Sequence, residues 1–176
     1  MNIVVYLGAS EGNDPVLKDR ICELGSWIGE SGHTLVYGGS ESGLMGMAAK
    51  SVLDAGGKVI GVEPQMFVDA GYVYDRITEL IITENMPVRK TKMIELGDAF
   101  IAFPGGTGTL DEISEIMVMK TLDQLDSPCI IYNIDGYYDG LKALIDKMLR
   151  KDLVSAEKIS GIIFAESLDE IKSHLM

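Results

Sequence analysis

The sequence predicts an α/β fold built on a mainly parallel, doubly wound sheet of about seven strands, with helices on both faces. Short apolar runs rich in β-branched residues alternate with helical patterns along nearly the whole chain, which is typical of strands covered on both faces. Glycine-rich segments follow three of these runs, where ligand-binding turns of parallel sheets lie. Both observations favour a fold of the Rossmann-like type.

The individual elements follow from local pattern. Continuous apolar stretches predict seven strands, at residues 3–7, 34–37, 58–62, 79–83, 99–103, 129–133 and 161–164. Apolar residues at helical spacing predict six helices between them, at residues 15–31, 44–55, 87–97, 110–122, 138–151 and 168–175. Pro15 and Pro87 stand in first turns, where proline is favoured, and Gly32 and Gly56 follow helix ends. The longest irregular segment, 63–75, is expected to form a lid or a loop beside a site.

Size and composition limit the function classes. A chain of 176 residues is expected to form one domain, residues 1–176. Its net charge of −12 argues against nucleic-acid binding, which needs a basic surface. The chain lacks an uninterrupted apolar run of about 18 residues, so no membrane span is expected. The absence of a signal-peptide pattern predicts a cytoplasmic protein. No cluster of His, Cys and acidic residues has metal-ligand spacing, so no metal is expected.

The most informative motif is Phe103-Pro104-Gly105-Gly106-Thr107-Gly108-Thr109-Leu110-Asp111-Glu112. It joins a predicted strand directly to a predicted helix. Its three glycines let backbone N–H groups approach an anion, and the helix N-terminus adds roughly half a positive charge. The motif therefore predicts a phosphate cradle with the Glu112 carboxylate beside it.

Glu112 has a second interpretation. Thr109 and Glu112 fit the capping box T-x-x-E, in which the acid hydrogen-bonds back to the N–H of the cap residue. Spacing favours neither role over the other.

A second charged feature lies at the start of the helix predicted over 87–97, with Asn85 as its cap. Arg89 and Lys90 stand in the first turn, where the helix dipole disfavours cations. Either something anionic offsets them, or both lie on a solvated face and pair with Glu84 or Glu95.

These segments resemble the Lonely Guy (LOG) family. Residues 104–112 match its PGGxGTxxE motif, and Met86 to Lys90 resembles its M-x-x-R-K element. The segments Tyr37-Gly38-Gly39 with Gly43-Leu44-Met45-Gly46, and Asn133-Ile134-Asp135-Gly136-Tyr137-Tyr138, also resemble family segments. The chain departs from the family pattern at Pro87, at Ser40 and over residues 118–123.

The resemblance implies a phosphoribohydrolase that cuts the N-glycosidic bond of cytokinin-type adenosine 5′-monophosphates, with no cofactor and with a small-molecule nucleoside monophosphate as substrate. It implies that Arg89 and Glu112 are the catalytic pair. Family members are often labelled lysine decarboxylases, but the sequence contains no pyridoxal-phosphate signature. The motifs and the loops at the sheet edge give nine candidate substrate-binding residues: Ser10, Gly39, Met86, Lys90, Gly105, Gly106, Thr107, Gly108 and Thr109.

Two further points stay open at this level. The helix over 110–122 carries Met117, Val118 and Met119, a methionine-rich face that favours a subunit interface, and the resemblance implies a homodimer. The alternative to an enzyme is a non-catalytic module that binds a nucleotide or another phosphate ligand. Phosphoribosyl transfer is disfavoured, because it calls for an acidic strand-end pair to hold magnesium-bound pyrophosphate.

Overall fold

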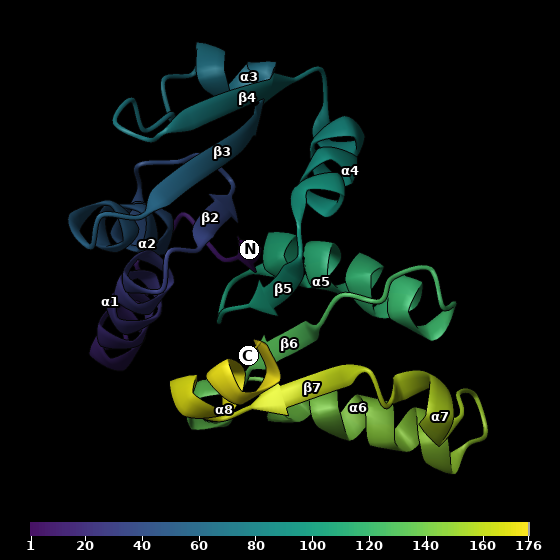
Figure 1. Ribbon diagram of the computed structural model, residues 1–176. Helices are drawn as coiled ribbons and strands as arrows, with labels where there is room; N and C mark the ends of the chain where they lie inside the picture. The colour runs from purple at the N-terminus through teal and green to yellow at the C-terminus, as the bar shows by residue number, and fades with distance from the viewer. Residues whose placement is uncertain (176) are drawn as a thin grey trace.

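A computed structural model of the protein describes residues 1–175 and confirms the predicted α/β fold (Figure 1). Within these residues one sheet contains seven strands in the order β4-β3-β2-β1-β5-β6-β7, and every neighbouring pair is parallel. The strands are β1 (Asn2–Tyr6), β2 (Thr34–Tyr37), β3 (Lys58–Pro64), β4 (Glu79–Thr83), β5 (Ala99–Ala102), β6 (Cys129–Tyr132) and β7 (Ile162–Ala165).

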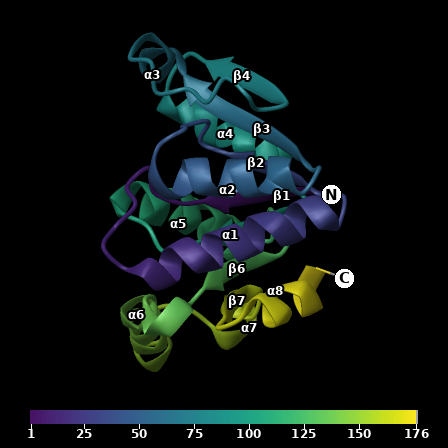
Figure 2. The same ribbon diagram turned by 90° about the vertical axis from the view of Figure 1, so that its left-hand side faces the viewer.

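Helices cover both faces of this sheet, as Figures 1 and 2 show. The longer ones are α1 (Pro15–Glu30), α2 (Gly43–Asp54), α4 (Met86–Leu96), α5 (Thr107–Thr121), α6 (Asp139–Arg150) and α8 (Leu168–Leu175). The shorter ones are α3 (Gln65–Asp69), α7 (Ala156–Ile159) and the 3-10 turn η1 (Ile134–Gly136).

Side chains alternate between the two faces of the sheet along each strand, and this alternation produces two hydrophobic cores. In β1, Ile3 and Val5 pack with α1, α2 and α8, whereas Val4 and Tyr6 pack with α4, α5 and α6. All four side chains are almost completely buried. Because successive residues of a strand point to opposite faces, the near-continuous apolar runs of the sequence are explained by burial on both sides.

The segment 63–75 differs from its prediction as an irregular loop. Strand β3 extends to Pro64 and the short helix α3 follows it directly. Ser40 and Val73 then form an isolated antiparallel bridge. The prediction was wrong here because a five-residue helix is too short to show an apolar period. The same reason explains why α7 was not predicted.

The chain reverses direction across the sheet between β1 and β5. Strands β1 to β4 run outward on one side, and α4 then returns the chain to β5 on the other side of β1. The loops that follow β1 and β5 therefore leave the sheet in opposite directions, and this is the point where ligands bind in doubly wound folds. No helix in residues 1–175 has the length and apolarity needed to cross a membrane.

Candidate active site

A cavity of about 770 Å³ opens at the carboxyl edge of the sheet. Its walls come from the ends of β1, β2 and β3, from α3, and from the first turns of α4 and α5. The structure brings eight of the eleven candidate site residues into this lining: Ser10, Met86, Arg89, Gly106, Thr107, Gly108, Thr109 and Glu112. Segments that are far apart in the sequence thus form one site.

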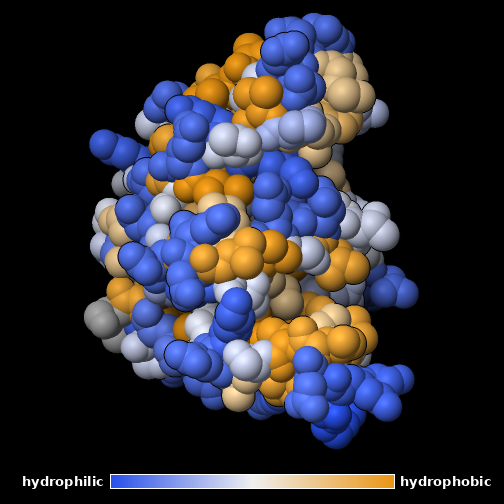
Figure 3. Space-filling view, turned by 90° about the vertical axis from the view of Figure 1, so that its right-hand side faces the viewer, coloured by the Kyte–Doolittle hydropathy of each residue, from blue (hydrophilic) through white to orange (hydrophobic). Residues whose placement is uncertain are grey.

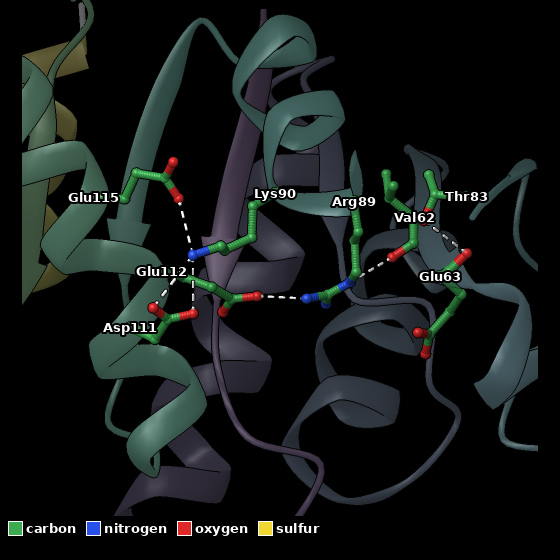
Figure 4. A network of polar contacts seen from close by, with 8 residues as sticks. All are labelled: Val62, Glu63, Thr83, Arg89, Lys90, Asp111, Glu112 and Glu115. Carbon is green, nitrogen blue, oxygen red and sulfur yellow. Dashed lines mark hydrogen bonds and ion pairs between the residues drawn. The ribbon is translucent and has the colours of Figure 1, made fainter. Parts of the chain in front are cut away.

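Arg89 and Glu112 form a buried ion pair inside the cavity (Figure 4). The Arg89 Nη1 atom donates to the Glu112 Oε1 atom at 2.6 Å, and Arg89 Nε donates to the Val62 carbonyl oxygen at 2.8 Å. The two residues are only 5% and 6% exposed. Charge-assisted hydrogen bonds of this kind are short and directional, so the pair fixes a carboxylate and a guanidinium at known positions in the cavity wall.

The charge state of Glu112 depends on two opposing effects. Burial raises the pKa of Glu112, because a charged carboxylate loses its hydration. The Arg89 guanidinium opposes this rise through its charge and its hydrogen bond. Arginine stays protonated at ordinary pH, so the pair favours the carboxylate form of Glu112, while burial is the larger effect and keeps the pKa of Glu112 above its ordinary value.

Arg89 and Lys90 lie in the first turn of α4, where the helix dipole disfavours positive charge, and the structure shows which acids offset them. Asn85 caps the helix, its Oδ1 accepting from Val88 N at 3.0 Å, as the sequence predicted. The offsetting anions come from α5. Arg89 pairs with Glu112, and Lys90 pairs with Asp111 and Glu115, each at 3.1 Å.

Pairing of these cations with Glu84 or Glu95 was therefore the wrong alternative, and Glu95 instead pairs with Lys92 at 3.2 Å. Lys90 is directed towards α5 and does not line the cavity. Its predicted role in substrate binding stays a prediction.

Helix α5 begins three residues earlier than predicted, at Thr107, with Gly106 as its N-cap. Thr109 consequently lies inside the first turn, where it cannot be the cap residue of a capping box. Its hydroxyl is buried and has no hydrogen-bond partner among residues 1–175. The carboxylate of Glu112 bonds Arg89 instead. The capping-box interpretation is wrong, because tertiary contact with α4 takes the acid that the local motif would have used.

The N-terminus of α5 faces the cavity with no side chain capping it. The first backbone N–H groups of a helix have no partner within the helix, and they carry partial positive charge. An anion in the cavity beside residues 106–109 would satisfy them. This arrangement fits the predicted phosphate cradle.

Two tyrosines after β6 hold the turn that precedes α5. Tyr138 Oη donates to the Phe103 carbonyl at 2.8 Å, and Tyr137 Oη donates to the Gly105 carbonyl at 2.6 Å. Asn133 orients this segment, its Oδ1 accepting from Tyr138 N at 2.6 Å. Sequence reasoning did not connect these residues with the cradle, because they lie about 30 residues further along the chain.

Glycines of the second glycine-rich segment make room for site side chains. A Cβ atom on residue 38 would lie 2.6 Å from Arg89 Nη2, and one on residue 39 would lie 2.5 Å from Glu63 Cγ. Gly39 and Gly105 are not part of the cavity lining. Gly105 lies directly behind it, where a Cβ atom would collide with the Thr109 hydroxyl.

Sequence reasoning missed Glu63, the penultimate residue of β3. It lines the cavity yet is only 4% exposed. Burial raises its pKa to about 7, an effect that Arg89 reduces and Glu112 adds to. The available signal was an acid at the end of an apolar strand, in Ile60-Gly61-Val62-Glu63-Pro64, at the sheet edge where ligands bind. Over residues 1–175 no group of three or more His, Cys, Asp or Glu residues could hold a metal ion.

Comparisons with known proteins identify the family of the chain. A family model described as "Possible lysine decarboxylase" matches residues 45–175. "Probable cytokinin riboside 5'-monophosphate phosphoribohydrolase LOGL1" of Oryza sativa subsp. japonica is 38% identical, with 96% of this chain and 76% of that protein covered. "Cytokinin riboside 5'-monophosphate phosphoribohydrolase LOG1" of Arabidopsis thaliana is 36% identical, with 98% and 81% covered.

Among solved structures, the molybdenum cofactor binding protein of the phototrophic bacterium Rippkaea orientalis has a TM-score of 0.71 and 25% identity, with 99% of this chain and 97% of that chain covered. The fold is therefore shared with a protein that is named for binding a molybdenum cofactor. The two plant relatives are more similar in sequence than this structure is, and both are named as phosphoribohydrolases. On these matches, the chain belongs to the Lonely Guy (LOG) family, in which the relatives above are named cytokinin riboside 5'-monophosphate phosphoribohydrolases.

Proposed function

We propose that the protein is a phosphoribohydrolase that splits the N-glycosidic bond of a nucleoside 5′-monophosphate, releasing the free base and ribose 5-phosphate. The observation that carries the proposal is the buried Arg89–Glu112 pair in the wall of a cavity that the N-terminus of α5 also lines. A site that only bound phosphate would gain nothing from a carboxylate beside the anion. The names of the curated relatives support the same activity.

The reaction needs stabilisation of positive charge on ribose. Loss of the base passes through an oxocarbenium-like ribosyl cation, which a carboxylate stabilises or traps, as in glycoside hydrolysis. Glu112 is the carboxylate in this role, and the Arg89 hydrogen bond holds it in place and favours its ionised form. The phosphate binds residues 106–109 at the start of α5, and Ser10 lies in the lining of the same cavity.

We propose further that the substrate carries an adenine or a cytokinin-type substituted adenine. Away from the phosphate cradle the cavity lining includes the large apolar or aromatic side chains of Met45, Phe67, Tyr72 and Met86. Such a lining suits a purine base and can take an apolar substituent on it. An adenine or substituted adenine is therefore the proposed leaving group.

One experiment tests the activity. Purified protein is incubated with AMP, with isopentenyladenosine 5′-monophosphate and with the two corresponding nucleosides, and the products are separated by chromatography. We expect free base from the monophosphates and little from the nucleosides, because the nucleosides leave the phosphate cradle empty.

The second candidate is a binding module without turnover, which the likeness to the molybdenum cofactor binding protein favours. Absence of free base from every substrate, together with heat of binding for AMP in calorimetry, would establish this candidate in place of the enzyme.

We further propose a homodimer formed through α5. Figure 3 shows clusters of apolar residues on the face that it displays. Leu110 and Val118 of α5 and its C-cap residue Leu122 are 45%, 55% and 53% exposed, and a second copy of the chain would cover these apolar side chains. Light scattering coupled to size exclusion is expected to give twice the chain mass, and Val118→Glu is expected to give the monomer. A monomeric wild-type protein would contradict the proposal.

A further inference from the structure

Three acids line the cavity, Glu63, Asp111 and Glu112, and Asp111 is paired with Lys90. Glu112 is bonded to Arg89, whereas the Glu63 carboxylate has no hydrogen-bond or ion-pair partner among the described residues (Figure 4). Besides the β3–β4 ladder, the hydrogen bond to this residue is made to its backbone, where Thr83 Oγ1 donates to the Glu63 carbonyl at 3.3 Å. The residue is only 4% exposed and lines the ligand cavity, so a group of a ligand bound there is the partner that remains for its carboxyl oxygens.

The position of Glu63 matches the far end of a bound nucleotide. The phosphate cradle follows β5, and Glu63 ends β3, with β1 and β2 between them. Three strand spacings of about 4.8 Å place the two features roughly 14 Å apart, which is the length scale of a nucleoside monophosphate. With the phosphate at α5, the base would lie at the β3 end, beside Phe67, Tyr72 and Met45.

We infer that Glu63 is the acid that protonates the leaving base, and that it works with Glu112 as a pair of unlike carboxyl groups across the cavity. The inference rests on the proposed hydrolase activity and adds to it the group that the leaving base needs.

The surroundings of Glu63 suit the protonated form. The charged and titratable groups that act on its carboxyl group are Arg89 of α4, Glu112 of α5 and the Tyr37 hydroxyl of β2. Burial and Glu112 raise the pKa of Glu63 to about 7, while Arg89 limits the rise. Glu112 has the direct bond to Arg89, which favours its carboxylate form, and Glu63 has no such bond, so Glu63 is the acid of the two that holds a proton more readily. In enzymes with two carboxyl groups of different pKa, one donates a proton and the other acts as the carboxylate.

The proposed step balances. As the bond from ribose C1′ to the base nitrogen breaks, its electron pair goes to the base and the Glu63 carboxyl proton goes to a ring nitrogen of the base. Glu112 stabilises the ribosyl cation. Water then adds its oxygen to C1′, and the proton that this water loses restores the Glu63 carboxyl group.

The test compares AMP with 7-methyladenosine 5′-monophosphate. The methylated base carries a fixed positive charge and leaves as a neutral molecule without taking up a proton. For AMP, wild-type kcat/KM is expected to fall as the pH rises above about 7, and for the methylated substrate kcat/KM is expected to stay flat. This comparison uses the unaltered protein, so it does not depend on any variant folding.

The Glu63→Gln variant sharpens the comparison. It is expected to lower kcat for AMP by about 10²–10⁴-fold, to lose the alkaline limb, and to hydrolyse the methylated substrate at close to the wild-type rate. Glu112→Gln is expected to fail on both substrates. Glu79→Gln, which removes an exposed acid from the opposite end of the adjacent strand β4, is the matched control and is expected to behave as wild type.

Other results would contradict either the role of Glu63 or the hydrolase activity, and the two cases can be told apart. Equal loss on both substrates would overturn the inference and assign Glu63 to positioning the base, and unchanged AMP hydrolysis by Glu63→Gln would overturn it as well. Wild-type protein that releases no base from either substrate would instead reject the hydrolase activity itself.

Discussion

The side chain of Glu63 fills the space that a side chain on residue 39 would need: a Cβ atom there would lie 2.5 Å from Glu63 Cγ. Gly39 also has a φ of +90°, a conformation that residues other than glycine rarely adopt. The glycine therefore serves the site indirectly, because it lets the acid of β3 lie against the end of β2.

Gly39→Ala is accordingly expected to displace the Glu63 carboxyl group. Both the strained φ and the overlap with Glu63 act against folding, and together they should lower the free energy of unfolding by about 1–3 kcal/mol. We expect kcat for AMP to fall with the alkaline limb of its pH profile shifted, measured in the same assay as wild type. Gly140→Ala on α6, where a Cβ atom meets nothing within 4 Å, is the control. Wild-type kinetics in Gly39→Ala would show that Glu63 does not need this space.

Glu112→Gln is expected to abolish release of free base. The amide cannot supply the negative charge that the ribosyl cation needs, and it leaves the Arg89 cation buried without a counter-charge, at a cost of about 3–5 kcal/mol. Chromatographic assay and urea unfolding measure the two effects. Glu95→Gln breaks the exposed Lys92 pair and should change neither.

The double variant Arg89→Met/Glu112→Leu separates stability from activity. Replacing both members of a buried pair by apolar residues is often neutral or stabilising, so this protein is expected to regain most of the stability lost in Glu112→Gln and to stay inactive. Recovery of activity would contradict a catalytic role for the pair.

Removal of the Tyr138 hydroxyl is expected to affect mainly stability, and removal of the Tyr137 hydroxyl is expected to affect mainly substrate binding. Tyr138 is buried, and Tyr138→Phe leaves the Phe103 carbonyl without its donor, which is expected to cost about 1–3 kcal/mol of unfolding free energy. Tyr137 is half exposed, so Tyr137→Phe should cost less stability. Because Tyr137 holds the Gly105 carbonyl in the cradle turn, we expect its loss to raise KM for AMP more than it lowers kcat. An unchanged KM would indicate that the turn keeps its shape without this bond.

Stability should depend on pH through Glu63. Its pKa of about 7 in the folded protein lies above the ordinary value of 4.5, so the folded state holds the proton more tightly than the unfolded state. The folded protein is then favoured at low pH, and this contribution is lost as the pH rises from about 4.5 to above 7.

The Glu63→Gln variant has no such titration. Relative to this variant, wild type is expected to lose roughly 3 kcal/mol of unfolding free energy between pH 4.5 and pH 8. Urea unfolding of both proteins at the two pH values measures the difference. A constant difference between them would show that burial does not perturb Glu63.

Local pattern predicted most of the fold. Strands such as β1 and β5 are short apolar runs that can only be stable when covered on both faces, and Asn85 with Pro87 defines the start of α4 through backbone chemistry within one turn. The start of α5 was predicted three residues late, because Thr107, Gly108 and Thr109 are poor helix formers and resemble a turn. Their helical conformation depends on contacts with the rest of the protein.

The sequence by itself determined the parallel α/β architecture, the glycine-rich turn between β5 and α5 and the two charged segments, since each depends on residues close together in the chain. Only the tertiary structure decided that Glu112 bonds Arg89 rather than capping its own helix, that Lys90 is directed to Asp111 and Glu115, and that Glu63 enters the same cavity. These contacts join β3, α4 and α5, and the choice between partners depends on burial. A carboxylate removed from water is stabilised most by the full charge of a guanidinium, and which cation reaches it depends on how the helices pack on the sheet.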